Sequence, residues 1–341
     1  MVSSAVQTEK SYCFENVTGS CIRITYSLTV QGILYGFLVL GTMVTIGGNL
    51  MVIISITHFK QLHSPTNILL ASLATADFLL GLTVLPFSSV RSVDSCWYFG
   101  DEFCQFHSCL DTAFGIASIS HLFLISIDRY CAIIHPLIYQ TKFTFTVAIF
   151  LISFIWITAV GFPFCLVYSK ANIEGLEEQV LAVSCIGNCQ PLFNEKWRII
   201  SFVAFFLAFF VMVGNYAKIF LVAKKQLKMI ENISVKSDKK HERHFKVTKR
   251  ERKAAKTLGI AVGAFVVCWL PFFIDVVIDT FCNYITPSHV FDALLWITYF
   301  KSALNPLIYS FFYPWFRKAL GLILTCKIAR SDCATINLYL E

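Results

Sequence analysis

Long apolar stretches recur seven times and limit what this 341-residue chain can fold into more than any other feature. A helix needs about 20 consecutive apolar residues to cross the hydrocarbon core of a bilayer. The connections are mostly short, which favours a single domain. We therefore expect an all-α membrane protein built as a seven-transmembrane helix bundle. The expected spans cover residues 33–57, 68–91, 104–134, 146–168, 197–223, 253–281 and 289–312.

The composition fits a membrane protein. Apolar residues make up 56% of the chain and charged residues 14%, against about 25% in a soluble domain. The first 32 residues are polar and lack the pattern of a cleaved signal peptide, so the first span should act as an uncleaved anchor. We expect an extracellular tail over 1–32, the bundle over 33–312, and a cytoplasmic helix and tail over 313–341.

Lys and Arg predict the orientation, because cytoplasmic loops carry an excess of both. With the N-terminus outside, the dense basic run from Lys224 to Lys256 falls inside. An odd number of spans then places the C-terminal segment inside as well. The net charge of +7 is therefore a topology signal. No motif that reads DNA or RNA accompanies it, so we expect no nucleic-acid partner and a multi-pass protein of the plasma membrane.

Cysteine placement agrees with this orientation. Seven cysteines fall outside, in an oxidising compartment, and an odd number leaves at least one unpaired or intermolecular. Sequence alone does not fix their connectivity. Asn16 opens a glycosylation sequon on the extracellular tail, whereas the sequon at Asn232 is cytoplasmic. The seven are Cys13, Cys21, Cys96, Cys104, Cys185, Cys189 and Cys282.

Asp111 is a carboxylate within an apolar span. Ionisable groups in a membrane are costly and tend to face a cavity or a partner, so Asp111 is a candidate binding residue. Arg129 follows 18 residues later, roughly 27 Å along a helix, which places the two near opposite membrane faces. The alternative is that Asp111 only satisfies a neighbouring polar group.

Short motifs occur in a fixed order along the spans. They are Gly48-Asn49, Leu73-Ala74-Thr75-Ala76-Asp77, Cys104 followed by Asp128-Arg129-Tyr130, Trp156, Cys268-Trp269-Leu270-Pro271 and Asn305-Pro306-Leu307-Ile308-Tyr309. Each motif is short, but their joint order over residues 48–309 is specific. The chain resembles the rhodopsin-like G-protein-coupled receptors.

Longer stretches carry a narrower resemblance. They run from Ser95 to Gly100, from Lys249 to Leu258, from Ser302 to Pro306, from Tyr313 to Ala319 and from Asn337 to Glu341. Over nearly its whole length the chain resembles the trace amine-associated receptors, most of all the olfactory members. The resemblance implies a receptor that binds a protonated amine and raises cyclic AMP through a stimulatory heterotrimeric G protein.

The same resemblance implies a ligand site in which the Asp111 carboxylate binds the ammonium group and the Tyr299 hydroxyl holds that carboxylate. The remaining expected ligand contacts are Trp269, Phe272, Phe273, Trp296 and Ser201. Aromatic residues at helical spacing are otherwise more often core or lipid-facing residues. Span five has no acid at its ligand-facing places, so we favour a volatile monoamine. A diamine that also uses Asp275 is the alternative.

Two disulfides are implied by the resemblance. Cys104 should pair with Cys189, which would tie span three to the second extracellular loop. Cys185 should pair with an N-terminal cysteine, and we prefer Cys21 to Cys13. Both bridges would roof the ligand site.

The cytoplasmic end should supply the output. Arg129 is always charged and needs a partner at rest, for which Asp128 and Glu251 are the candidates. Ligand binding should favour the state in which these contacts break and span six moves outward. The stretch from Trp315 to Leu320 suits a helix lying on the inner lipid leaflet. Further expected switch residues are Tyr130, Tyr216, Asn305, Pro306 and Tyr309.

Three residues depart from the family pattern. Lys301 stands where relatives have an amide, beside the sodium-binding cavity formed by Asp77, Ser118, Ser302 and Asn305. Our hypothesis is that Lys301 displaces sodium and changes basal activity; the alternative is that it swings elsewhere. Ala208 replaces a proline in span five, and His135 replaces an acid. A poorly signalling receptor or scaffold is therefore the alternative function.

Other classes of protein fit less well. His121 has no serine-protease or zinc spacing around it, so we expect no enzyme, cofactor or catalytic metal. No internal repeat of the kind found in transporters is visible.

Overall fold

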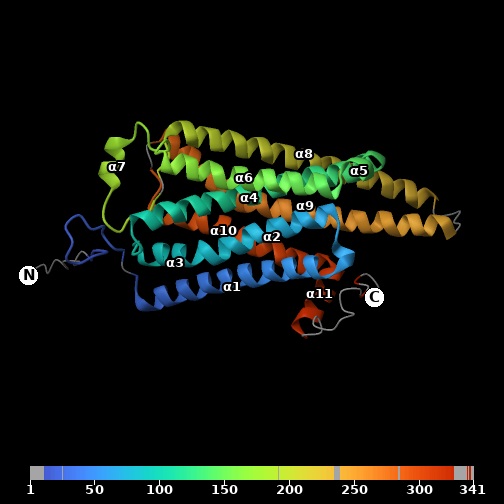
Figure 1. Ribbon diagram of the computed structural model, residues 1–341, viewed down its shortest axis with the longest axis horizontal. Helices are drawn as coiled ribbons and strands as arrows, with labels where there is room; N and C mark the ends of the chain where they lie inside the picture. Colours follow the sequence, from blue (N-terminus) through green and yellow to red (C-terminus); the bar gives the residue numbers. More distant parts are fainter. Residues whose placement is uncertain are drawn as a thin grey trace, which may run out of the picture.

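The computed structural model describes residues 11–24, 26–190, 192–233, 239–282 and 285–325, with positions 336 and 338. Its long helices run side by side in one elongated bundle (Figure 1). The elements are α1 Leu28–His58, η1 Lys60–Leu62, α2 Pro65–Thr83, α3 Leu85–Asp94, α4 Asp101–Ile134, α5 Pro136–Lys142, α6 Phe145–Tyr168, α7 Glu177–Val183, α8 Glu195–Ile233, α9 Lys239–Phe281, α10 Ser288–Phe312 and α11 Pro314–Leu324.

Six helices in the described part of the chain are long and apolar enough to cross a membrane. They are α1, α2, α4, α6, the part of α8 over Glu195–Val222 and the part of α9 over Gly259–Phe281. The seventh, α10, carries Asp292 and Lys301 and packs against α9 and α1. The expected seven-helix bundle is confirmed. Two of its helices begin at capping residues: the side chains of Ser64 and Thr144 accept hydrogen bonds from the backbone N–H groups of Asn67 and Val147.

The second expected span is not one helix. It breaks at Val84 into α2 and α3, with Pro86 in the first turn of α3. A proline has no N–H group and its ring crowds the preceding turn, so a helix cannot continue through it undisturbed. Prediction of a single helix over residues 68–91 was wrong at this point.

The helices of spans five and six extend well past the expected membrane boundaries. α8 continues to Ile233, and α9 begins at Lys239. These charged extensions lie at the end of the bundle that also carries α5 and α11, whereas α7 lies at the opposite end (Figure 1). α8 runs unbroken through Ala208, as expected for a position without the family proline.

The bundle buries polar groups and exposes apolar ones. Phe150, Ile157 and Phe220 are among the exposed large side chains, each at least 69% exposed. Asn49 and Asp77 are buried inside. A lipid-facing surface favours this arrangement, because polar groups in a membrane protein are placed in the bundle interior.

Gly48 sets the distance between α1 and α10. A Cβ atom built on Gly48 would lie 2.6 Å from Cγ of Pro306. Any side chain here would therefore push the two helices apart, and close helix approach in membranes relies on small residues of this kind. The Gly48-Asn49 motif thus has a packing reason.

We expect Gly48→Ala to lower the melting temperature of the purified protein in detergent, because overpacking typically costs about 1–3 kcal/mol. Gly47→Ala is the matched control, since a Cβ there would meet nothing within 4 Å. Equal melting temperatures for the two variants would contradict the close packing of α1 on α10.

Candidate ligand site and cytoplasmic switch

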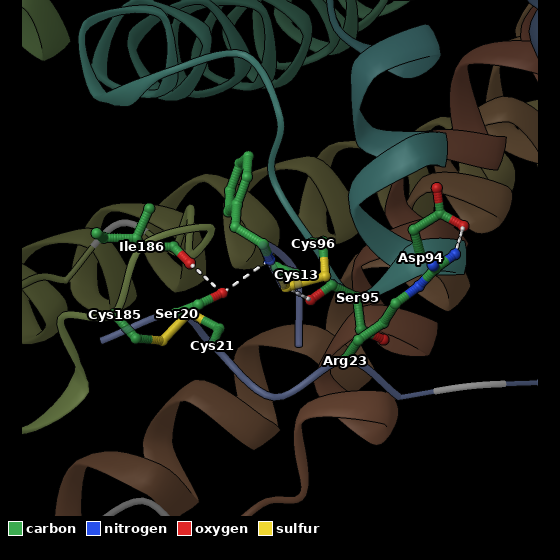
Figure 2. Close-up of a disulfide and its surroundings, with 10 residues drawn as sticks. Cys13, Ser20, Cys21, Arg23, Asp94, Ser95, Cys96, Cys185 and Ile186 are labelled. Carbon is green, nitrogen blue, oxygen red and sulfur yellow. Dashed lines mark hydrogen bonds and ion pairs between the residues drawn. A yellow bond between two sulfur atoms is a disulfide. The ribbon is translucent and has the colours of Figure 1, made fainter. Parts of the chain in front are cut away.

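Three disulfides cross-link the extracellular end. Figure 2 shows the N-terminal segment joined to two loops, through Cys13–Cys96 and Cys21–Cys185. The third joins Cys104 in the first turn of α4 to Cys189. The two pairs that the resemblance implied are therefore present. Cys13–Cys96 was not foreseen, and Cys282 is left free and exposed.

Noncovalent contacts hold the same roof together. Arg23 and Asp94 form an ion pair at 3.4 Å (Figure 2). Gly187 has a φ of +101°, and a Cβ there would meet the Cβ of Cys13 at 2.9 Å, so only glycine fits beside the first disulfide. Asn16 is exposed on the short segment between Cys13 and Cys21.

Asp111 and Tyr299 meet below this roof. The Tyr299 hydroxyl of α10 donates a hydrogen bond to Oδ2 of Asp111 on α4 at 2.6 Å. Tyr299 is buried and Asp111 half-buried. A short bond from a neutral hydroxyl fixes the carboxylate rotamer without cancelling its charge. Cys104 lies two helical turns earlier on α4, so its disulfide with Cys189 closes the same end.

An aromatic block lies beside α4 at the next turn. Cη2 of Trp269 would be 3.5 Å from a Cβ on Gly115, which is one turn after Asp111. Trp269 packs against Phe272 and Phe273, with ring centroids 6.2 and 5.8 Å away. α9 carries these three rings and the internal Pro271. Three of the expected aromatic contacts are thus gathered on one helix next to α4.

Phe205 was missing from the expected site. It is buried on α8, and its ring centroid lies 3.8 Å from that of Phe273 in a stacked pair. Ser201, which was expected to face the ligand, is exposed, and none of the described contacts links it to Asp111. The sequence offered no means to separate Phe205 from the other 32 phenylalanines, since the chain has 33 Phe.

Trp296 has a supporting position. Its indole N–H donates to Oγ of Ser92 on α3 at 3.0 Å, and its ring packs edge-on against Tyr299 at 5.3 Å. The Trp296 indole therefore packs against the tyrosine whose hydroxyl bonds Asp111, and it limits the movement of that ring. Asp275 is held on one side only: its Oδ1 accepts from the Thr286 hydroxyl of the α9–α10 loop at 2.8 Å, and its Oδ2 has no hydrogen-bond partner in the described structure.

A buried ionic cluster lies at the middle of the bundle. Asp77 of α2 accepts from Ser302 and Asn305 of α10, both at 2.7 Å, and from Ser118 of α4 at 3.1 Å. The Lys301 ammonium group lies 3.5 Å from Asp77 and also donates to Ser118. Lys301 does not swing away. It points into the cluster and is 1% exposed.

Arg129 is held at the cytoplasmic end. Its guanidinium approaches Asp128 to 2.6 Å and donates to Thr66 of α2. The Tyr139 hydroxyl of α5 donates to Asp128 at 2.6 Å and accepts from Arg129 at 3.3 Å. Glu251, the other expected partner, lies in the part of α9 whose side chains are outside the described structure.

Tyr139 was not foreseen as a switch residue. Burial and the nearby Asp128 carboxylate raise its pKa to about 12, because both disfavour a phenolate. The hydroxyl therefore remains a donor throughout the physiological pH range. No structure or role was expected for the residues of α5, which lie between the third and fourth expected spans.

The remaining switch residues lie nearby on three helices. Tyr130 of α4 carries the Lys218 ammonium 5.7 Å above its ring. Tyr216 of α8 and Tyr309 of α10 have buried hydroxyl groups without a hydrogen-bond partner in the described structure. Burying a hydroxyl without a hydrogen-bond partner costs free energy, which favours a conformation in which both groups find partners. On α10, Asn305 donates a hydrogen bond to Asp77, and the ring of Pro306 lies against Gly48 of α1.

This arrangement defines a seven-transmembrane receptor, and residues 48–309 match the family described as 7 transmembrane receptor (rhodopsin family). Among relatives, Trace amine-associated receptor 9 of Mus musculus is 54% identical over 96% of this chain and 95% of its own length. Trace amine-associated receptor 7a of Rattus norvegicus is 52% identical over 96% and 92%. Trace amine-associated receptor 9 of Homo sapiens is 51% identical over 100% and 99%.

The chain belongs to the trace amine-associated receptors within the rhodopsin family. It is a multi-pass plasma-membrane protein, and its family consists of receptors and not of enzymes.

Removing the unforeseen disulfide should weaken the fold. We expect the double variant Cys13→Ser with Cys96→Ser to lose roughly 2–5 kcal/mol of stability, measured as a lower melting temperature. Cys282→Ser, which changes a free cysteine, should melt like the native protein. Peptide mapping without reduction provides a direct check, and a Cys13–Cys282 peptide would refute the pairing.

Proposed function

We propose that this receptor binds a protonated amine through Asp111 and signals through a stimulatory G protein to raise cyclic AMP. The observation that carries the proposal is the 2.6 Å hydrogen bond from Tyr299 to Asp111. It leaves one carboxylate oxygen, Oδ1, available for a ligand donor. The names of the relatives point to the same ligand class.

The ammonium group of a ligand would bind Asp111 strongly because the carboxylate lies away from water inside the bundle. A hydrogen bond between an ammonium and a carboxylate is charge-assisted and is worth about 1.5–3 kcal/mol net. At about 1.4 kcal/mol per tenfold change, this anchor corresponds to roughly 10- to 150-fold in affinity. The neighbouring rings Trp269 and Phe272 offer π faces, which favour a cation and an apolar or aromatic ligand body.

A monoamine fits better than a diamine. A second ammonium group would need a second free carboxylate near the first. The expected alternative, Asp275, accepts from Thr286 through Oδ1, while its Oδ2 has no hydrogen-bond partner in the described structure, so a diamine that reaches it remains the alternative. The ligand-facing place on α8 holds Ser201, which supplies no acid. We infer that the ligand is a volatile monoamine, sensed by an olfactory-type member of the family.

The route from ligand to G protein runs through α9. Trp269 packs close to Gly115, one turn after Asp111 on α4, so a ligand on Asp111 bears on this indole. Pro271 interrupts the hydrogen-bond ladder of α9 just after Trp269, which lets the cytoplasmic half of the helix swing. Outward movement of that half would open a surface for the G protein next to Arg129, whose described contacts lie on α4, α2 and α5.

The anchor is tested by cyclic AMP accumulation in cells that express the native receptor or Asp111→Ala, given a panel of volatile amines. We expect an amine response in the native receptor and a loss of at least tenfold in potency for Asp111→Ala. Tyr299→Phe keeps the charge but frees the carboxylate, so a smaller loss of roughly 2- to 10-fold is expected.

Surface labelling must show equal receptor levels for this comparison. A full response in Asp111→Ala would refute the amine anchor. Silence of the native receptor and the variant alike would favour the alternative, a receptor or scaffold that signals poorly because of Lys301 and Ala208.

Tyr139 gives a separate prediction about the resting state. Tyr139→Phe removes the donor to Asp128, so we expect basal cyclic AMP to rise about fivefold, as for loss of one hydrogen bond worth about 1 kcal/mol. Thr141→Ala is the control on the same helix, because Thr141 bonds only the Ile138 carbonyl among its described contacts. Basal signalling that stays at the native level in Tyr139→Phe would show that this hydroxyl does not restrain Arg129.

A further inference from the structure

Lys301 is a charged group buried in the interior of the bundle. Its side chain is 2% exposed and that of Asp77 is 1% exposed. Isolated buried charges are very costly, so each of these groups requires the other. The ammonium also donates to Ser118, whose own hydroxyl donates to Asp77. The cluster therefore joins α2, α4 and α10 through one ion pair.

Both carboxylate oxygens of Asp77 accept from protein donors, and most of these donors crowd Oδ1. A carboxylate offers about four lone-pair positions. Oδ1 accepts from Ser118, Ser302 and Lys301, and Oδ2 accepts from Asn305. Oδ1 therefore has more donors than its two lone pairs, whereas Oδ2 has one described donor and one lone pair left.

The family resemblance implies a sodium ion among these side chains, and the residues present do not fit one. A hard cation binds through carboxylate and hydroxyl oxygens with free lone pairs. Here Oδ1 of Asp77 has no free lone pair, Oδ2 has one, and the Ser118 oxygen already accepts from the Lys301 ammonium. A second cation would also be repelled by that ammonium at close range in a poorly screened interior.

We propose that Lys301 is a resident counter-ion that takes the place of a mobile cation. In this chain the positive charge opposite Asp77 is covalently part of α10. The restraint that fastens α10 to α2 and α4 is therefore permanent. It does not vary with the sodium concentration around the receptor, and sodium does not select one state of the bundle at this place.

Thermal unfolding in detergent provides the test, with sodium chloride compared with choline chloride at equal ionic strength. The native receptor should melt at the same temperature in both salts. Lys301→Asn opens the cluster and restores an oxygen ligand, so it should melt several degrees higher in sodium than in choline. The matched control is Asp77→Asn combined with Lys301→Asn, which lacks the carboxylate and should respond to neither salt.

A sodium-specific rise in the native receptor would overturn the proposal, and so would equal melting of Lys301→Asn in the two salts. Lys301→Gln replaces Lys301→Asn if the latter is not recovered from membranes, and the same two outcomes apply. The measurement needs no amine. Its failure would therefore leave the Asp111 proposal untouched, and failure of the amine response would leave this one untouched.

Discussion

The cost of a charge in a water-free interior governs this structure. Within the bundle a carboxylate or an ammonium must find a partner, because lipid offers none. The central cluster around Asp77 is the clearest case. Asp77 of α2 pairs with Lys301 of α10, and hydroxyl groups from α4 and α10 add hydrogen bonds to this ion pair. Arg129 is treated in the same way at the cytoplasmic end, with its partners drawn from α4, α2 and α5. Asp111 differs, because its described partner is a neutral hydroxyl and its charge is not balanced.

These sites are mechanically linked through α10. Tyr299 and Lys301 are two residues apart on that helix, and one reaches Asp111 while the other reaches Asp77. A rotation of α10 that loosens one contact must therefore disturb the other. Trp296 adds a further restraint from α3 on the same helix. The ligand site and the centre of the bundle thus share one helix. α9 can bend at its internal Pro271, and α10 has an internal proline of its own, Pro306, on the cytoplasmic side of both contacts.

Sequence patterns predicted what depends on local chemistry. The spans follow from apolar length, and the Asp111–Tyr299 pair follows from family motifs. The break at Val84 could have been read from Pro86, which lies within an otherwise apolar stretch. The Cys13–Cys96 bridge could not, because parity leaves several connectivities open. Nor could the stacking of Phe205, since a buried and a lipid-facing phenylalanine look alike in a span that is apolar on all sides.

The Cys21–Cys185 bridge has a consequence for how the molecule is made. Cys21 precedes α1, whereas Cys185 follows α6, so the bond spans the first four membrane crossings. Cys21 reaches the oxidising compartment early but must wait there, unpaired, until the loop after α6 has been translocated, whereas the partner of Cys13, Cys96, already lies between α3 and α4. During that interval Cys21 is available to wrong partners, which include Cys13 until Cys96 has been reached. Correct assembly thus depends on the order in which segments of the chain cross the membrane. A delay in inserting α6 would favour wrong disulfide pairing among the extracellular cysteines.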